Sequence, residues 1–117
     1  MIVVKIDEMP EDERTGGIFE GTVSIRPLVN ESVGAKDLKL DIVTFPPGVR
    51  NKFHTHTYDQ VLYILSGKGV VATHKEEHVV EHGMLIFIPA GEEHWHGATH
   101  ASSFSHISIL RPGETIY

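Results

Sequence analysis

Residues 48–67 read GVRNKFHTHTYDQVLYILSG, a stretch that combines metal-binding side chains with the turn residues that would place them. His54 and His56 are two positions apart, so on a β-strand they point to the same face and can bind one ion through their imidazole nitrogens. After a short turn, Gln60 opens an apolar run that an antiparallel hairpin would bring back beside the histidine pair. The stretch predicts a metal site built on short strands.

A second block, residues 83–94, reads GMLIFIPAGEEH and supplies the ligand that the first one lacks. His94 lies thirty-four positions after Gln60, so a distant strand must bring it to the site. Both blocks have the same spacing at their start. Five residues separate Gly48 from His54 in the first block and Gly83 from Pro89 in the second. This spacing makes the histidine pattern more specific than a chance cluster.

With this spacing, the two blocks resemble the two motifs of the cupin superfamily, and the resemblance covers roughly residues 38–110. It implies an all-β protein, a cupin double-stranded β-helix or jelly-roll barrel, that holds a divalent metal inside. The implied metal ligands are His54, His56, Gln60 and His94. The sequence departs from the usual motifs at Gln60, where the family usually has glutamate, and at Ala98, where it often has asparagine.

A narrower resemblance is to the small manganese-dependent cupin hydroxynitrile lyases. It rests on residues 19–28, 93–99 and 105–109 and on the ligand set of three histidines and one glutamine. It implies a lyase-type enzyme with one divalent ion per chain, manganese first, although iron, zinc, nickel or copper also suit these ligands. It further implies that His96 and His106 are catalytic, as base and hydrogen-bond donors toward a small-molecule substrate.

The amide of Gln60 changes the charge of the predicted site. A carboxylate ligand would cancel one of the two charges of the metal, whereas an amide cancels none. The metal should therefore be a stronger Lewis acid, and its oxidation to the trivalent state is disfavoured. This favours proton transfer and carbon–carbon cleavage over oxygen activation. The alternative for Gln60, as the only glutamine of the chain, is a solvated turn residue.

The remaining histidines are sorted by strand period. His96 shares the face of His94, and His106 alternates with an isoleucine on the last strand, so both are predicted to face the pocket rather than the rim. The others are predicted to be exposed, because they lie among charged and turn residues. They are His74, His78, His82 and His100.

Length and charge exclude several classes of protein. The 117 residues suffice for one core, so a single domain over 1–117 is predicted, with its barrel core at about 38–110 and an N-terminal strand and loop at 1–18. Sixteen acidic and ten basic residues give a net charge of −6 with no basic cluster, which argues against binding to nucleic acid or anionic membranes. The absence of cysteine and of a long apolar run fits a cytoplasmic protein.

Short strands separated by glycine and proline turns predict a closed barrel or jelly roll independently of the motifs. Met1–Ile6 is apolar and is predicted to be a strand, and Asp7–Gly17 is charged and is predicted to be a surface loop. An exposed edge strand tends to be buried against a partner, so we expect a homodimer that uses Met1–Ile6.

Three classes of function remain open. The first is a metal-dependent lyase in which a histidine moves the proton. The second is a cupin dioxygenase that acts on a small diketone or phenolic compound, which oxygen consumption would reveal. The third is a non-enzymatic protein that binds metal or a small ligand without turnover. The sequence ranks them in this order.

Overall fold

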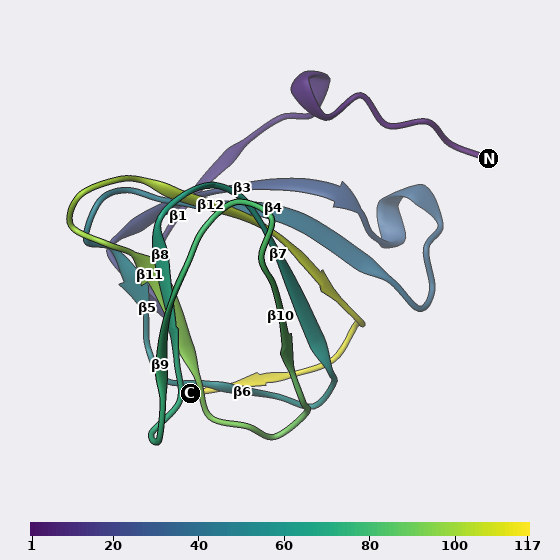
Figure 1. Cartoon of the computed structure of the whole chain (residues 1–117). Coiled ribbons are helices and arrows are strands. Elements are labelled where there is room, and N and C mark those ends of the chain that lie inside the picture. The colour runs from purple at the N-terminus through teal and green to yellow at the C-terminus, as the bar shows by residue number, and fades with distance from the viewer.

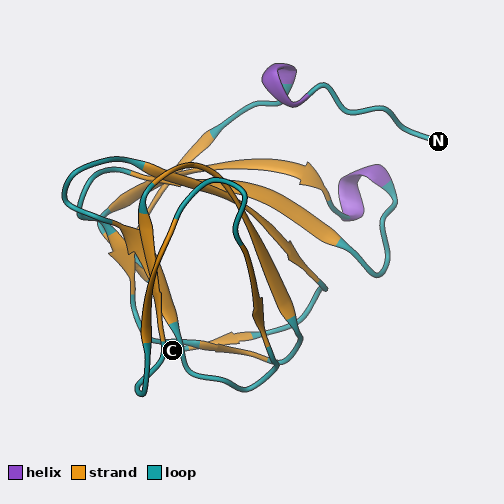
Figure 2. Cartoon of the chain, viewed as in Figure 1, coloured by secondary structure: helices purple, strands orange, loops and turns teal.

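The computed structural model describes residues 1–117 and consists mainly of short strands (Figures 1 and 2). Its two 3-10 helices are η1 (Ile6–Glu8) and η2 (Glu31–Val33). The strands are β1 (Asp12–Thr15), β2 (Phe19–Glu20), β3 (Thr22–Val29), β4 (Lys39–Phe45), β5 (Arg50–Asn51), β6 (Thr55–His56), β7 (Gln60–Gly67), β8 (Gly69–Ala72), β9 (Glu77–Val80), β10 (Leu85–Ile88), β11 (Trp95–Ala98), β12 (Phe104–Leu110) and β13 (Thr115–Ile116). The predicted all-β fold is confirmed. Neither helix has the length or the apolar character to span a bilayer.

Two antiparallel sheets form the walls of a barrel. One has six strands in the order β1-β3-β4-β12-β7-β10, and the other has five in the order β2-β5-β11-β8-β9. A separate pair, β6 with β13, crosses one end of the barrel, at the bottom of Figure 1. Because β6 carries His56, this end of the barrel holds part of the predicted metal site.

The core lies between the sheets, where alternate residues of each strand point inward. Leu62 and Ile64 of β7 are fully buried, and so are Phe45 of β4 and Phe104 of β12, whose ring centroids lie 6.2 Å apart. Burial of each such side chain contributes about 1.5–3 kcal/mol to stability. These apolar side chains support the polar site at one end of the barrel.

The N-terminal predictions are wrong in two respects. Met1–Ile6 is not a strand: residues 1–5 have no regular structure, and Ile6 begins η1. The segment extends away from the barrel, where no strand is available to pair with it (Figure 1). The predicted loop Asp7–Gly17 instead contains β1, which pairs with the edge of β3 that β4 leaves free. Its charged residues are typical of an edge strand.

The predicted hairpin between the histidine pair and Gln60 does not form either. β6 pairs with β13, while β7 pairs with β12 on one edge and with β10 on the other. A strand has only two edges for hydrogen bonding, so β7 has none left for β6. Gln60 nevertheless reaches the site from the first position of β7.

Candidate metal centre

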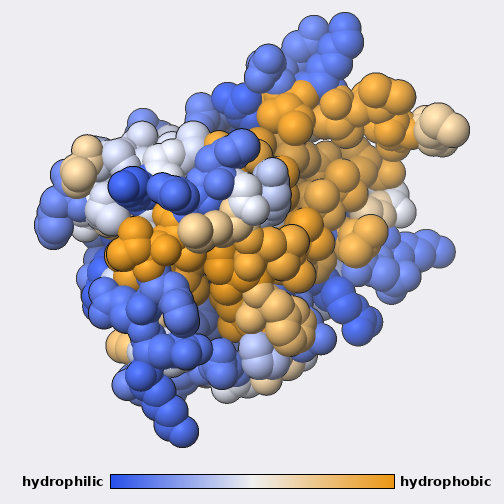
Figure 3. All heavy atoms as spheres, viewed as in Figure 1, coloured by the Kyte–Doolittle hydropathy of each residue, from blue (hydrophilic) through white to orange (hydrophobic).

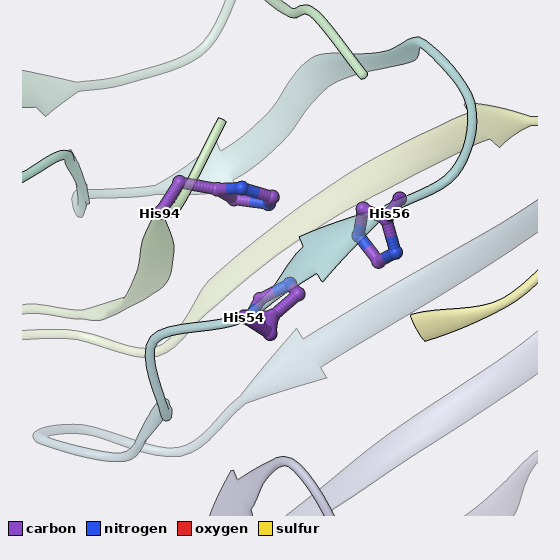
Figure 4. A group of neighbouring side chains, drawn as sticks. All are labelled: His54, His56 and His94. Carbon is purple, nitrogen blue, oxygen red and sulfur yellow. The ribbon is translucent and has the colours of Figure 1, made fainter. Parts of the chain in front are cut away.

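Three histidines from distant segments converge at one end of the barrel. His54 and His94 form an isolated antiparallel bridge, with backbone N···O distances of 3.0 and 3.1 Å, and His56 follows on β6. One potential ligand atom from each ring lies within 4.8 Å of the others. Figure 4 shows the three rings turned toward a common space.

Backbone carbonyls determine which nitrogen faces that space. The Nδ1 atom of His54 lies 2.7 Å from the Lys52 oxygen, and that of His94 lies 2.8 Å from the Glu92 oxygen. A carbonyl oxygen can only accept, so each Nδ1 carries the proton and donates it. In a neutral imidazole the Nε2 atom then has a free lone pair, as a metal ligand requires.

Buried polar atoms without hydrogen-bond partners indicate what this space holds. Among them are Nε2 of His56, Nε2 of His94, whose Nδ1 carries the proton, and the amide oxygen Oε1 of Gln60. A buried polar atom left unpaired costs about 1–3 kcal/mol, and two acceptors such as Nε2 of His94 and Oε1 of Gln60 cannot satisfy one another. A divalent cation satisfies all of them at once, so the donor set fits the metal that the sequence predicts.

The protonation state of the ligands agrees with this assignment. Burial lowers the pKa of His54 to about 4, with smaller contributions from the neighbouring imidazoles. Burial also lowers the pKa of His56 to about 4, an effect that the adjacent Gln60 side chain partly opposes, and it lowers the pKa of His94. All three rings are therefore neutral near pH 7, the form that binds metal.

The C-terminal segment completes the site. Nδ1 of His56 lies 2.9 Å from the hydroxyl oxygen of Thr115 on β13 and 3.1 Å from that of Tyr58. Partners of this kind orient the imidazole, although a hydroxyl group can donate or accept and so leaves both tautomers open. Sequence reasoning missed both hydroxyl partners, and no motif in the last residues of the chain would have indicated Thr115.

A pair of histidines lies beside the three clustered ones. Nδ1 of His96 and Nε2 of His106 are 3.2 Å apart, and the ring of His96 lies 6.0 Å from that of His94. Burial lowers the pKa of His96 well below its ordinary value and that of His106 to about 4, so both are neutral. The structure places both rings inward, in the phase that the strand period predicts.

Two polar residues hold this pair, and sequence reasoning missed them. Asn51 of β5 contacts His96, and Ser108 of β12 contacts His106. Ser108 shares the inward phase of His106, so strand alternation was an available signal for it. The contact between Asn51 and His96 requires a glycine at position 97. A Cβ atom there would lie 2.4–2.6 Å from atoms of Val49 and Arg50, so only glycine lets β11 approach β5 this closely. The histidines predicted to be exposed are so: His74, His78, His82 and His100.

A cavity of about 550 Å³ opens between β9 and β10 and reaches the metal centre. Its walls are mostly apolar, with Val71, Val80 and Ile86 among them, and His94 lines its inner end. His96 and His106 are enclosed in the core and do not line it.

Comparison with known proteins agrees with this geometry. A family model described as "Cupin domain" matches residues 41–110, which is more than half of the chain. The chain is a cupin. The family identification made from the two motifs is confirmed, and so is the jelly-roll fold.

Among characterised cupins, the chain is 36% identical over 94 residues to an (R)-mandelonitrile lyase of Granulicella tundricola, a match that covers 78% of this chain and 70% of that protein. It is 34% identical to an acireductone dioxygenase of Parasynechococcus marenigrum and 33% identical to the dimethylsulfoniopropionate lyase DddW of Ruegeria pomeroyi. These two matches cover 56% and 63% of this chain but only 39% and 49% of the relatives.

Solved structures agree with the fold. A cupin-like protein of Thermotoga maritima aligns with a TM-score of 0.86 at 27% identity, covering 97% of this chain and 88% of that one. The polyketide cyclase RemF of Streptomyces resistomycificus aligns with a TM-score of 0.87 at 20% identity, covering 99% and 84%. The second likeness is one of fold alone.

Proposed function

We propose that this cupin is a metal-dependent lyase of the hydroxynitrile lyase type, acting on a small molecule. The observation that carries the proposal is the convergence of acceptor atoms from three neutral histidines and the Gln60 amide, next to two further neutral histidines. The similarity to the mandelonitrile lyase over most of the chain supports the reaction class. The bound metal, manganese in our proposal, supplies Lewis acidity toward a substrate oxygen.

The protein would supply the proton transfers. In cyanohydrin cleavage, a base removes the hydroxyl proton, the electrons of the O–H bond form the carbonyl, and the C–CN bond breaks with its electron pair on cyanide. His106 is our candidate base, with His96 as the hydrogen-bond donor that orients it; neither lines the cavity, so a substrate would have to pass His94 to reach them. The protonated base then returns its proton to cyanide. Burial against Phe45 and Phe104 excludes water from this pair.

The experiment is to load the purified protein with manganese and to follow mandelonitrile cleavage by the release of benzaldehyde and cyanide. Metal-dependent turnover supports the lyase. A dioxygenase is the second candidate, because the chain also resembles acireductone dioxygenases, and it would consume oxygen with a suitable substrate. Metal binding without either activity would favour a non-enzymatic binding protein.

Gln60→Glu tests the role of the amide ligand. The added negative charge should tighten manganese or iron binding and lower the Lewis acidity of the metal. We expect slower release of metal to a chelator, slower cyanohydrin cleavage and easier oxidation of the bound metal in air. Asn30→Asp is the control, because it adds the same charge at the cap of η2, where an aspartate can still accept from the Ser32 N–H. If all three properties stay unchanged in Gln60→Glu, the amide is not a ligand.

We also propose that the protein is a cytoplasmic homodimer. The outer face of the six-stranded sheet is apolar where solvated sheets are usually polar: Leu40 lies beside Ile109 and Ile42 beside Ile107 in register. Apolar side chains also gather over β10 and on part of the N-terminal arm (Figure 3), and Phe87 is 59% exposed. A second copy, packed by a twofold axis, would cover these surfaces with the same residues.

Deletion of residues 1–6 should weaken this dimer, because Met1, Ile2 and Val3 are apolar, exposed and extend from the barrel. We expect the truncated protein to be monomeric or aggregated by light scattering. The full-length variant Ile2→Ser with Val3→Ser separates the apolar character of the arm from its length. A truncated protein that remains dimeric would refute the role of this arm.

A further inference from the structure

A row of buried polar side chains runs from β5 to the metal centre. Nδ2 of Asn51 lies 3.3 Å from Nε2 of His96, and Nδ1 of His96 lies 3.2 Å from Nε2 of His106. The hydroxyl oxygen of Ser108 lies 3.4 Å from Nδ1 of His106 and 3.5 Å from Nε2 of Gln60. Each of these residues is at most 4% exposed, so water does not compete for these contacts.

One backbone contact determines the direction of the hydrogen bonds from Asn51 as far as Ser108. The N–H of His96 donates to Oδ1 of Asn51 over 2.8 Å, and a backbone N–H can only donate. The other amide atom of Asn51 is therefore its NH2 group, which donates to Nε2 of His96. A neutral imidazole has one N–H, so the proton of His96 is on Nδ1 and is donated to Nε2 of His106. The proton of His106 is then on Nδ1 and is donated to Ser108.

Ser108 also links this row to Gln60, the candidate metal ligand. Ser108 has two lone pairs, so it can accept from His106 and also from the NH2 group of Gln60. With its nitrogen directed at Ser108, Gln60 turns its oxygen toward the histidine Nε2 atoms, where that oxygen has no protein partner.

We propose that Asn51 and Ser108 are positioning residues for the site: Asn51 sets the tautomers of His96 and His106, and Ser108 orients the amide of Gln60 with its oxygen toward the metal. In this arrangement the lone pair on Nε2 of His106 accepts from His96, so His106 can take up a proton only where that hydrogen bond opens. The reverse tautomer would already carry a proton on this Nε2 atom. Only the orientation of Gln60 rests on the proposed metal function, since the tautomers follow from the protein contacts alone.

The test of Asn51 is the substitution Asn51→Asp, read by nitrogen-15 NMR of histidine-labelled, zinc-loaded protein. The carboxylate still accepts from the His96 N–H, but it can no longer donate to Nε2 of His96. We expect Nδ1–H tautomers for both histidines in the wild type and Nε2–H tautomers for both in Asn51→Asp. Nε2–H tautomers in the wild type, or an unchanged His106 in the variant, would overturn the proposal. The wild-type spectrum suffices if the variant does not fold.

The test of Ser108 is the metal affinity of Ser108→Ala, measured by zinc competition with a chromophoric chelator. We expect binding to weaken about tenfold to a hundredfold, as is typical when a residue that orients a ligand is lost. Ser105→Ala is the matched control, because Ser105 lies on the same strand and bonds to Thr44 on the outer face. Equal affinities of the two variants would overturn the role of Ser108. Loss of the metal function itself would instead appear as a wild type that binds no zinc.

Discussion

Replacing His56 and His94 together by alanine is expected to abolish metal binding. The two substitutions remove two of the three clustered imidazoles, and both lost Nε2 atoms are buried without a hydrogen-bond partner. The remaining His54 and Gln60 cannot hold a divalent ion against a chelator. Metal analysis after dialysis should give one ion per chain in the wild type, the stoichiometry expected for this site, and close to none in the double variant.

The matched control removes two exposed histidines, with His78→Ala and His82→Ala in one chain. This protein should keep its metal, which would show that the effect depends on the buried cluster and not on the histidine content. Circular dichroism should give the same strand signal for both variants. Full metal occupancy in the His56→Ala, His94→Ala protein would contradict the assignment of the site.

The second large effect is expected on activity and not on metal binding. His106→Ala should keep its metal, because His106 is absent from the cluster of ligand atoms, and should lose about a hundredfold to ten-thousandfold in the rate of cyanohydrin cleavage. The measurement is kcat at a fixed, verified metal occupancy. A loss in kcat at constant occupancy shows that His106 is needed for turnover and not for metal binding.

His106 is fully buried, so its replacement by alanine also leaves a cavity that could lower stability. His106→Gln fills more of this space and supplies polar atoms without a base of the same strength. We expect it to restore the melting temperature toward that of the wild type but not the rate. If activity falls only in proportion to lost metal, His106 supports the site and does not act in the reaction.

Much of the fold could be predicted from residue patterns. The apolar run after Gln60 is predicted as a strand, and it forms β7, in which Leu62 and Ile64 are fully buried. The two motifs located His54, His56 and His94, because strand period and turn spacing are local properties that a sequence displays directly. The strand predicted for Met1–Ile6 failed, because a strand also needs a partner edge, and that is not a local property.

By itself, the sequence determined that the chain forms short strands and which histidines could share a strand face. Only the tertiary structure decided that β13 brings Thr115 to His56, and that Asn51 meets His96 where Gly97 allows two strands to approach closely. These contacts join segments up to 59 residues apart, as Thr115 and His56 are. The direction of a hydrogen bond depends on which atoms face each other across the barrel, and the spacing of residues along the chain does not reveal this.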